Sequence, residues 1–194
     1  MTPIAFDAIV LAGGRSSRLG GTPKAELTRE GQTLLTRALV AAAGARRLAI
    51  VGETGREALP ADAVLCREFP AFGGPVAGIA AGLAALSGGA DRVLVLGCDM
   101  PGVGEAAGPL LLAAETGPTT ADALIAHPDG DQPQPLAALY RREALEAVLA
   151  DGSAAGRSMR SVLAQLRWEP VLVPAGSCDD VDTWEDAARL GWEG

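Results

Sequence analysis

Histidine, cysteine and lysine are scarce in this chain of 194 residues, which contains one histidine, three cysteines and a single lysine. One histidine excludes a multi-histidine metal centre, and a Ser-His-Asp triad would have to use that residue, His127. The cysteines at positions 66, 98 and 178 are odd in number and widely spaced, so they indicate neither a disulfide framework nor a zinc site. His127 precedes Pro128 at a predicted strand end and turn, and we expect an ordinary, half-exposed loop residue.

Basic residues are outnumbered by acidic ones, with 16 Lys and Arg against 24 Asp and Glu, and the formal net charge is −8. This balance argues against nucleic acid or an anionic membrane surface as a partner. No basic leader segment opens the chain and no apolar run approaches membrane-spanning length, so we expect a cytoplasmic protein. An anionic substrate would have to be bound locally, by backbone N–H groups, a few cations and a metal.

Apolar runs alternate with helical patterns along the whole chain, and no linker or repeat divides it. Such alternation requires crossover connections, so we predict a single domain, residues 1–194, with a three-layer α/β/α Rossmann-like fold and a mostly parallel sheet. The predicted strands are 5–11, 48–51, 63–66, 92–96, 123–126, 136–140 and 168–173, and the predicted helices are 33–43, 76–86, 106–115, 142–150, 157–166 and 184–190.

The only lysine, Lys24, ends a glycine-rich segment that begins at Leu11, directly after the first predicted strand. Gly13 and Gly14 allow close backbone approach, and successive N–H groups there can form an anion-binding concavity. A compact ammonium at the end of such a loop suits phosphate oxygens better than the planar fork of arginine. The segment lacks the GK[ST] motif, so it is not a P-loop. It also lacks GxGxxG spacing, and this absence disfavours a nicotinamide-dependent oxidoreductase with a Rossmann fold.

This segment resembles the nucleotidyltransferase signature LAGG-x-S-x-R-(L/M)-G-x-x-(P)-K. Within that superfamily the chain is most similar to the molybdenum cofactor guanylyltransferases. Four further segments carry the resemblance in the expected order: 74–79, 96–101, 134–140 and 180–186.

The resemblance implies a nucleotide site and a catalytic set. Lys24, Asp99 and Arg15 would be catalytic, and Asp99, after a buried strand, would bind Mg²⁺. The alternative for Asp99 is a helix N-cap. The implied nucleotide-binding residues are Leu11, Ala12, Gly13, Gly14, Lys24, Gly52, Arg67, Glu68, Gly74, Pro75, Asp99 and Asp180.

Two positions depart from the family pattern near the base. Strict spacing puts Arg67 where many of these enzymes carry an aspartate that reads the guanine edge, and Glu68 is adjacent. A carboxylate can accept hydrogen bonds from guanine N1–H and the 2-amino group, whereas arginine cannot, so we favour Glu68 for that role, with the loop shifted by one residue. Gly52 stands where some members carry asparagine.

Two later segments have both a functional and a structural interpretation. Asp180 and Asp182 can face the acceptor or help to hold the metal, while Asp182 and Glu185 can form a capping box that starts the last helix. We expect Asp180 to be the residue free for function. Residues 156–158 match a family segment that faces the pterin, or they simply begin a helix.

The predicted activity is therefore transfer of GMP from GTP to the terminal phosphate of molybdopterin, with Mg²⁺ as cofactor. Proteins that deliver the pterin or accept the finished cofactor would be transient partners. Alternatives are a CTP-dependent molybdopterin cytidylyltransferase, a transferase for another small phosphorylated acceptor, or a non-catalytic nucleotide-binding protein. The presence of both Lys24 and Asp99 argues against the last of these.

Overall fold

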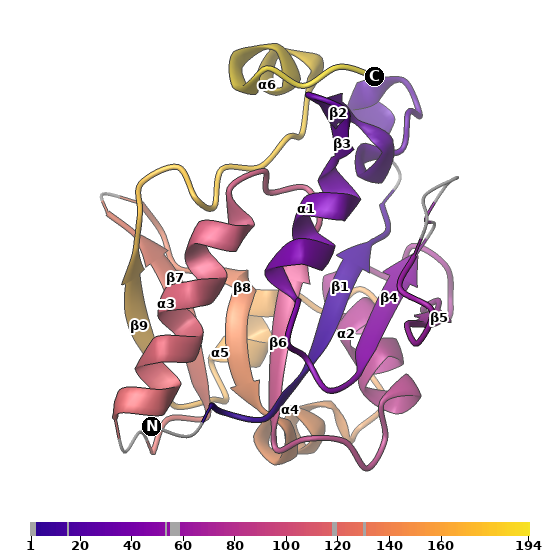
Figure 1. Ribbon diagram of the computed structural model, residues 1–194. Coiled ribbons are helices and arrows are strands. Elements are labelled where there is room, and N and C mark those ends of the chain that lie inside the picture. The colour runs from indigo at the N-terminus through magenta and orange to yellow at the C-terminus, as the bar shows by residue number, and fades with distance from the viewer. Residues whose placement is uncertain (1–2, 15, 53, 55–58, 118–119, 130) are drawn as a thin grey trace.

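The computed structural model describes residues 3–14, 16–52, 54, 59–117, 120–129 and 131–194. A seven-stranded sheet with the order β5-β4-β1-β6-β8-β7-β9 runs through the molecule (Figure 1). Only β8 is antiparallel to its neighbours, so the predicted mostly parallel α/β fold is confirmed. The strands are β1 (Phe6–Ala12), β4 (Leu48–Gly52), β5 (Val64–Cys66), β6 (Arg92–Gly97), β7 (Ala123–Pro128), β8 (Gln134–Arg141) and β9 (Trp168–Val173).

Helices cover both faces of this sheet and bury a separate apolar core on each. Ala8 and Val10 of β1 belong to one core, while Ile9 points into the other, as strand periodicity requires. The first core packs under α1 (Leu34–Ala41) and α3 (Val103–Thr116), and the second under α2 (Pro75–Ala85), α4 (Arg142–Leu149) and α5 (Met159–Leu163). His127 is half-buried within β7, so the expectation of a loop residue is wrong.

A third, smaller cluster joins the segment after β1 to the last helix, α6 (Trp184–Leu190), beyond the carboxyl ends of the parallel strands (Figure 1). The first part of the chain contributes the 3₁₀ turns η1 (Ser17–Leu19) and η2 (Lys24–Glu26) and a hairpin of β2 (Thr28–Arg29) and β3 (Gln32–Thr33). Thr28 and Glu193 exchange backbone hydrogen bonds of 2.7 and 2.8 Å. The cluster consists of Leu19, Leu27, Leu34, Val181, Ala187 and Trp192.

The strand order places a topological switch beside β1. The chain passes from β1 through α1 to β4 on one side, and later returns through α2 to β6 on the other side. Such a reversal opens a crevice at the carboxyl ends of the strands, where ligands bind in open α/β sheets.

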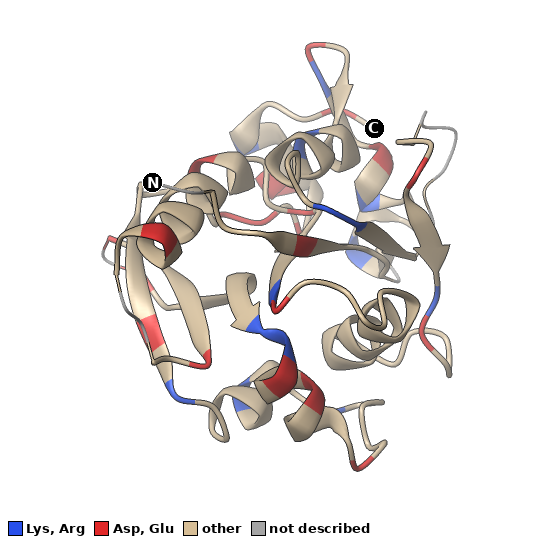
Figure 2. Cartoon of the chain, turned by 60° about the horizontal axis from the view of Figure 1, so that its bottom comes forward, with Lys and Arg blue, Asp and Glu red and all other residues tan. Residues whose placement is uncertain are grey.

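Acidic and basic residues are scattered over many elements (Figure 2). Among the described helices, none is both long and apolar enough to cross a membrane.

A buried ion pair ties the opposite, amino end of the sheet together. Asp7 is completely buried in β1, and its Oδ2 accepts hydrogen bonds from Arg142 at 2.7 Å and from the Ala90 amide at 2.9 Å. Arg142 Nε in turn donates to the Ala90 carbonyl at 2.7 Å. Gly89 leaves the space for this contact, because a Cβ there would lie 1.8 Å from Asp7 Oδ2.

We expect Asp7→Ala to lower the free energy of unfolding by about 3 to 5 kcal/mol, because the buried Arg142 cation loses its buried counter-charge and is left with the more exposed Glu146 carboxylate, 3.4 Å away. Urea denaturation would measure the change, with Asp62→Ala at an exposed position as the control. A near wild-type unfolding midpoint for Asp7→Ala would contradict the role given to this pair.

Candidate functional site

Two adjoining pockets open where the carboxyl ends of β1, β4 and β6 meet. The larger has a volume of about 350 Å³ and the smaller about 270 Å³. Both are lined by Gly13, Gly14, Lys24, Glu68 and Phe72. A volume of this size accommodates a small-molecule ligand.

Most of the predicted nucleotide-binding residues meet at these pockets. The larger pocket is lined by Leu11, Gly13, Gly14, Lys24, Glu68, Gly74, Pro75 and Asp99, and the smaller also by Ala12, Gly52 and Arg67. Asp180 lines a separate cavity of about 260 Å³. Arg15 lies outside the described residues.

The glycine loop lies directly against the end of β4. Gly52 has φ +122°, and a Cβ at this position would lie 2.5 Å from the Gly13 nitrogen, so any side chain would require the backbone to move. This contact explains why the chain requires glycine at position 52. Ser16 then turns the loop with φ +44°, and its Oγ accepts a hydrogen bond from the Lys24 amide at 3.3 Å.

Asp99 follows β6 by two residues and faces the glycine loop. The Cys98 amide donates to the Leu11 carbonyl at 3.0 Å, and the Asp99 carbonyl accepts from the Val181 amide at 2.9 Å. Helix α3 begins at Val103 without a side-chain cap, and the Asp99 carboxylate instead contacts Lys24. Its geometry therefore does not fit the alternative of a helix N-cap.

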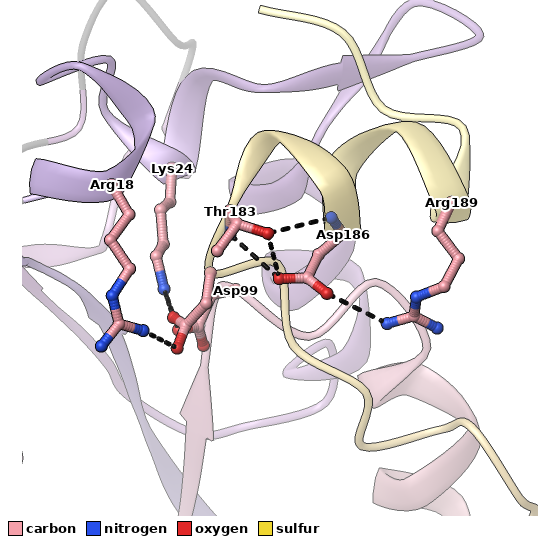
Figure 3. A network of polar contacts seen from close by, with 7 residues as sticks. Arg18, Lys24, Asp99, Thr183, Asp186 and Arg189 are labelled. Carbon is pink, nitrogen blue, oxygen red and sulfur yellow. Dashed lines mark hydrogen bonds and ion pairs between the residues drawn. The ribbon is translucent and has the colours of Figure 1, made fainter.

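Lys24 joins the carboxylates at the mouth of the larger pocket. Its Nζ lies 3.0 Å from Asp99 Oδ2 and also bonds to Asp182 Oδ1, while Arg18 lies 3.3 Å from Asp182 Oδ2. Arg18, Lys24 and Asp99 converge in Figure 3. Burial by itself would lower the pKa of Lys24, but Asp99 and Asp182 outweigh that effect and raise it, so the ammonium stays charged.

Three carboxylates gather around this lysine. Asp99, Asp180 and Asp182 can each offer an oxygen within 4.8 Å of the others. Burial raises the pKa of Asp180, and the negative charges of Asp182 and Asp99 raise it further. A group of hard oxygen donors with an excess of negative charge is chemically suited to a divalent cation such as Mg²⁺.

The predicted capping box is wrong by one residue. Thr183, not Asp182, is the N-cap of α6, and its side chain accepts from the Asp186 amide, while Asp186 accepts from the Thr183 amide (Figure 3). This shift leaves the Asp182 carboxylate turned toward Lys24 and Arg18. Asp182 therefore belongs to the ionic cluster, although the sequence analysis favoured Asp180 as the functional residue.

The segment 156–158 has structural contacts of its own. Arg157 Nη1 donates to the Val148 carbonyl at 2.8 Å, and Ser158 caps α5 by accepting from the Ser161 amide. These contacts agree with the interpretation as a helix start. Two residues of the site were not predicted from the sequence. Arg18 lies inside the glycine-rich signature, and Phe72 is part of a loop broken by Pro and Gly.

Comparisons with known proteins agree with this geometry. Residues 8–180 match the family model described as the MobA-like NTP transferase domain. The molybdenum cofactor guanylyltransferase of Pseudomonas fluorescens (strain SBW25) is 35% identical over 103 residues, which span 52% of this chain and only 50% of that protein. A probable molybdenum cofactor guanylyltransferase of Chloroflexus aggregans is 32% identical over 169 residues, which span 84% of this chain and 78% of that protein.

A solved structure extends the similarity to nearly the whole chain. The molybdopterin-guanine dinucleotide biosynthesis protein A from Archaeoglobus fulgidus superposes with a TM-score of 0.67 and is 25% identical, and the alignment covers 94% of this chain and 95% of that one. This chain belongs to the MobA-like NTP transferase family.

Proposed function

We propose that the protein transfers GMP from GTP to the terminal phosphate of molybdopterin, forming the guanine dinucleotide cofactor and pyrophosphate. The observation that carries this proposal is the meeting of Lys24, Asp99 and Asp182 beside the pocket bounded by the glycine loop. The names of the relatives from Pseudomonas and Chloroflexus support the choice of substrates.

The reaction needs positioning and charge neutralisation rather than a covalent enzyme intermediate. An oxygen of the acceptor phosphate forms a bond to the α-phosphorus of GTP, the bond from that phosphorus to the bridging oxygen breaks, and pyrophosphate leaves in line. The backbone N–H groups of Gly13 and Gly14 would orient the phosphates from the loop. Lys24 would neutralise charge as pyrophosphate departs.

Lys24 is well placed to change partners when the nucleotide binds. Its side chain is only 19% exposed and lines both pockets, while its ammonium contacts the Asp99 and Asp182 carboxylates. An ammonium has three donors and can contact phosphate oxygens while it retains one carboxylate. The release of Asp182 or Asp99 would then leave oxygens available for a metal ion.

Asp99, Asp180 and Asp182 are the residues that would hold Mg²⁺, because their oxygens are mutually close and chemically hard. When bound, the ion would supply positive charge to the phosphate oxygens. Asp99 lines the larger pocket, whereas Asp180 lines the separate cavity of about 260 Å³.

Product analysis tests the proposed reaction. The protein would be incubated with Mg²⁺, molybdopterin and, in separate reactions, each of the four nucleoside triphosphates labelled at the α-phosphate. The proposal predicts a labelled guanine dinucleotide and pyrophosphate from GTP. A labelled cytosine dinucleotide would instead assign the chain to a cytidylyltransferase, and no transfer to molybdopterin would require another acceptor.

Lys24→Ala should reduce kcat by about 10²- to 10³-fold, the effect of removing one positioned electrostatic donor. Lys24→Arg should restore only part of this loss, because the longer planar fork misplaces the charge. Arg46→Ala is the matched control, since it removes a cation from an exposed position at the amino edge of the sheet. Wild-type turnover in Lys24→Ala would refute the assignment.

Asp99→Asn should abolish most of the activity and weaken Mg²⁺ binding, with little change in the melting temperature. Asparagine preserves the size of the side chain but lacks the charge that a divalent ion requires. Asp91→Asn, at the other end of β6, provides the control. Calorimetric titration with Mg²⁺ would supply the binding constant. Unchanged metal affinity in Asp99→Asn, or lost stability with retained activity, would count against the metal role.

Base preference is the third expectation for this site. If Glu68 accepts from guanine N1–H and the 2-amino group, the protein should prefer GTP to ITP, which lacks the amino donor, and should discriminate against ATP. Each bond to a charged acceptor contributes about 1.5 to 3 kcal/mol, enough for at least tenfold selectivity. Glu68→Gln should narrow the gap between GTP and ITP.

Competition binding of GTP, ITP, ATP and CTP to the wild type and to Glu68→Gln measures this selectivity. Tighter binding of CTP than of GTP would favour the cytidylyltransferase alternative, which the presence of Arg67 at the usual carboxylate position keeps open. Equal GTP to ITP ratios in the two proteins would remove Glu68 from the base edge.

A further inference from the structure

Phe72 is an unusual residue at the entrance to both pockets. Its side chain lines both of them, yet it is 55% exposed. Its backbone has φ +60°, a left-handed conformation that costs free energy for any residue with a Cβ. Two glycines follow directly at positions 73 and 74, so the chain places an aromatic ring where glycine would fit with less strain.

The backbone around Phe72 is held on both sides. Its amide donates to Glu68 Oε1 at 3.0 Å, and the next carbonyl, of Gly73, accepts from the Gly156 amide at 2.7 Å. Gly73 itself is tightly enclosed, because a Cβ there would lie 2.9 Å from Ala77 Cβ and 3.0 Å from the Pro70 carbonyl oxygen. These contacts position the backbone that carries the aromatic ring.

The rest of the larger pocket suits a flat ring. Leu11, Val51 and Pro75 give it apolar walls, while Lys24 and Asp99 also line it and supply its charged groups. A nucleotide has the same division, with a planar base and a charged phosphate chain. Aromatic side chains bind bases of any sequence because every base has a π-face.

We infer that Phe72 is a stacking platform for the base of the donor nucleotide, and that Glu68 is a positioning residue that holds Phe72 through its amide. This inference rests on the proposed function, since it assumes that the pocket binds a nucleoside triphosphate. The Phe72 amide uses one lone pair of Glu68 Oε1, so the carboxylate keeps free lone pairs on both oxygens with which to accept from the two donors of the guanine edge.

Equilibrium binding without the acceptor tests the platform. Phe72→Leu retains most of the apolar volume, and leucine would have to adopt the same left-handed backbone conformation, but the aromatic plane is lost. The variant should therefore bind GTP more weakly, by on the order of tenfold. Phe72→Tyr should bind GTP like the wild type. Inorganic tripolyphosphate, which has no base, should bind equally to all three proteins. Phe69→Leu is the matched control, because Phe69 is 96% exposed and lies outside the lining of both pockets.

Glu68 variants test the positioning role. Glutamine also has a carbonyl oxygen that can accept from the Phe72 amide, so Glu68→Gln should retain the contribution of the ring, whereas Glu68→Ala should lose it. The loss that Phe72→Leu causes in the wild-type background should shrink in the Glu68→Ala background, because without the acceptor of its amide the ring is no longer positioned and contributes less to binding. Fully additive losses would overturn the link between the two residues.

The outcomes separate this inference from the proposed function. If the protein binds CTP rather than GTP, the assignment of guanine fails, and the Leu and Tyr variants measured with CTP still decide whether the ring stacks on the base. Equal loss of tripolyphosphate and nucleotide binding in Phe72→Leu would overturn the stacking role. A raised KM for molybdopterin with unchanged GTP affinity would assign the ring to the acceptor and would also overturn it.

Discussion

The ion pairs of Lys24 with Asp99 and Asp182 are the constraint on which the site depends, because they join three segments that are far apart in the chain. The backbone supports this meeting: the Asp99 carbonyl accepts the Val181 amide, and Leu19 and Leu27 pack with Val181 in the small apolar cluster beside α6. The end of the glycine loop, the end of β6 and the C-terminal segment are therefore held together as one unit. A substitution that moves any of these three segments should therefore also move the charged groups of Lys24, Asp99 and Asp182.

The cluster is better suited to binding than to stability. Lys24 is largely buried, which by itself would lower its pKa, and the neighbouring Asp99 and Asp182 carboxylates raise it instead. Partly buried ion pairs gain little net free energy once desolvation is counted. The charged groups are nevertheless already gathered at one place, so in the proposed reaction only the partners of Lys24 would have to change when a triphosphate and a metal ion bind. The buried Asp7 and Arg142 pair stabilises the opposite end of the sheet, away from these demands.

Much of the fold was predictable because buried strands have continuous apolar runs, and Ser or Thr caps mark the start of α1, α5 and α6. The antiparallel direction of β8 follows from its short connection to β7, which allows no crossover. The hairpin of β2 and β3 has strands of two residues, too short to show a period. Asp182 and Thr183 are both good N-cap residues, so local preference could not choose the register. The pairing of Asp7 with Arg142, 135 residues apart, has no local signal.

A crystal structure of the protein with GTP and Mg²⁺ is the most direct test of the central claim that Lys24 and the carboxylates form the phosphate and metal site. The account predicts Lys24 Nζ within hydrogen-bond distance of a phosphate oxygen, and a metal ion bound between Asp99 and the same phosphate chain. A nucleotide bound away from the glycine loop, with Lys24 still paired to both Asp99 and Asp182, would contradict it.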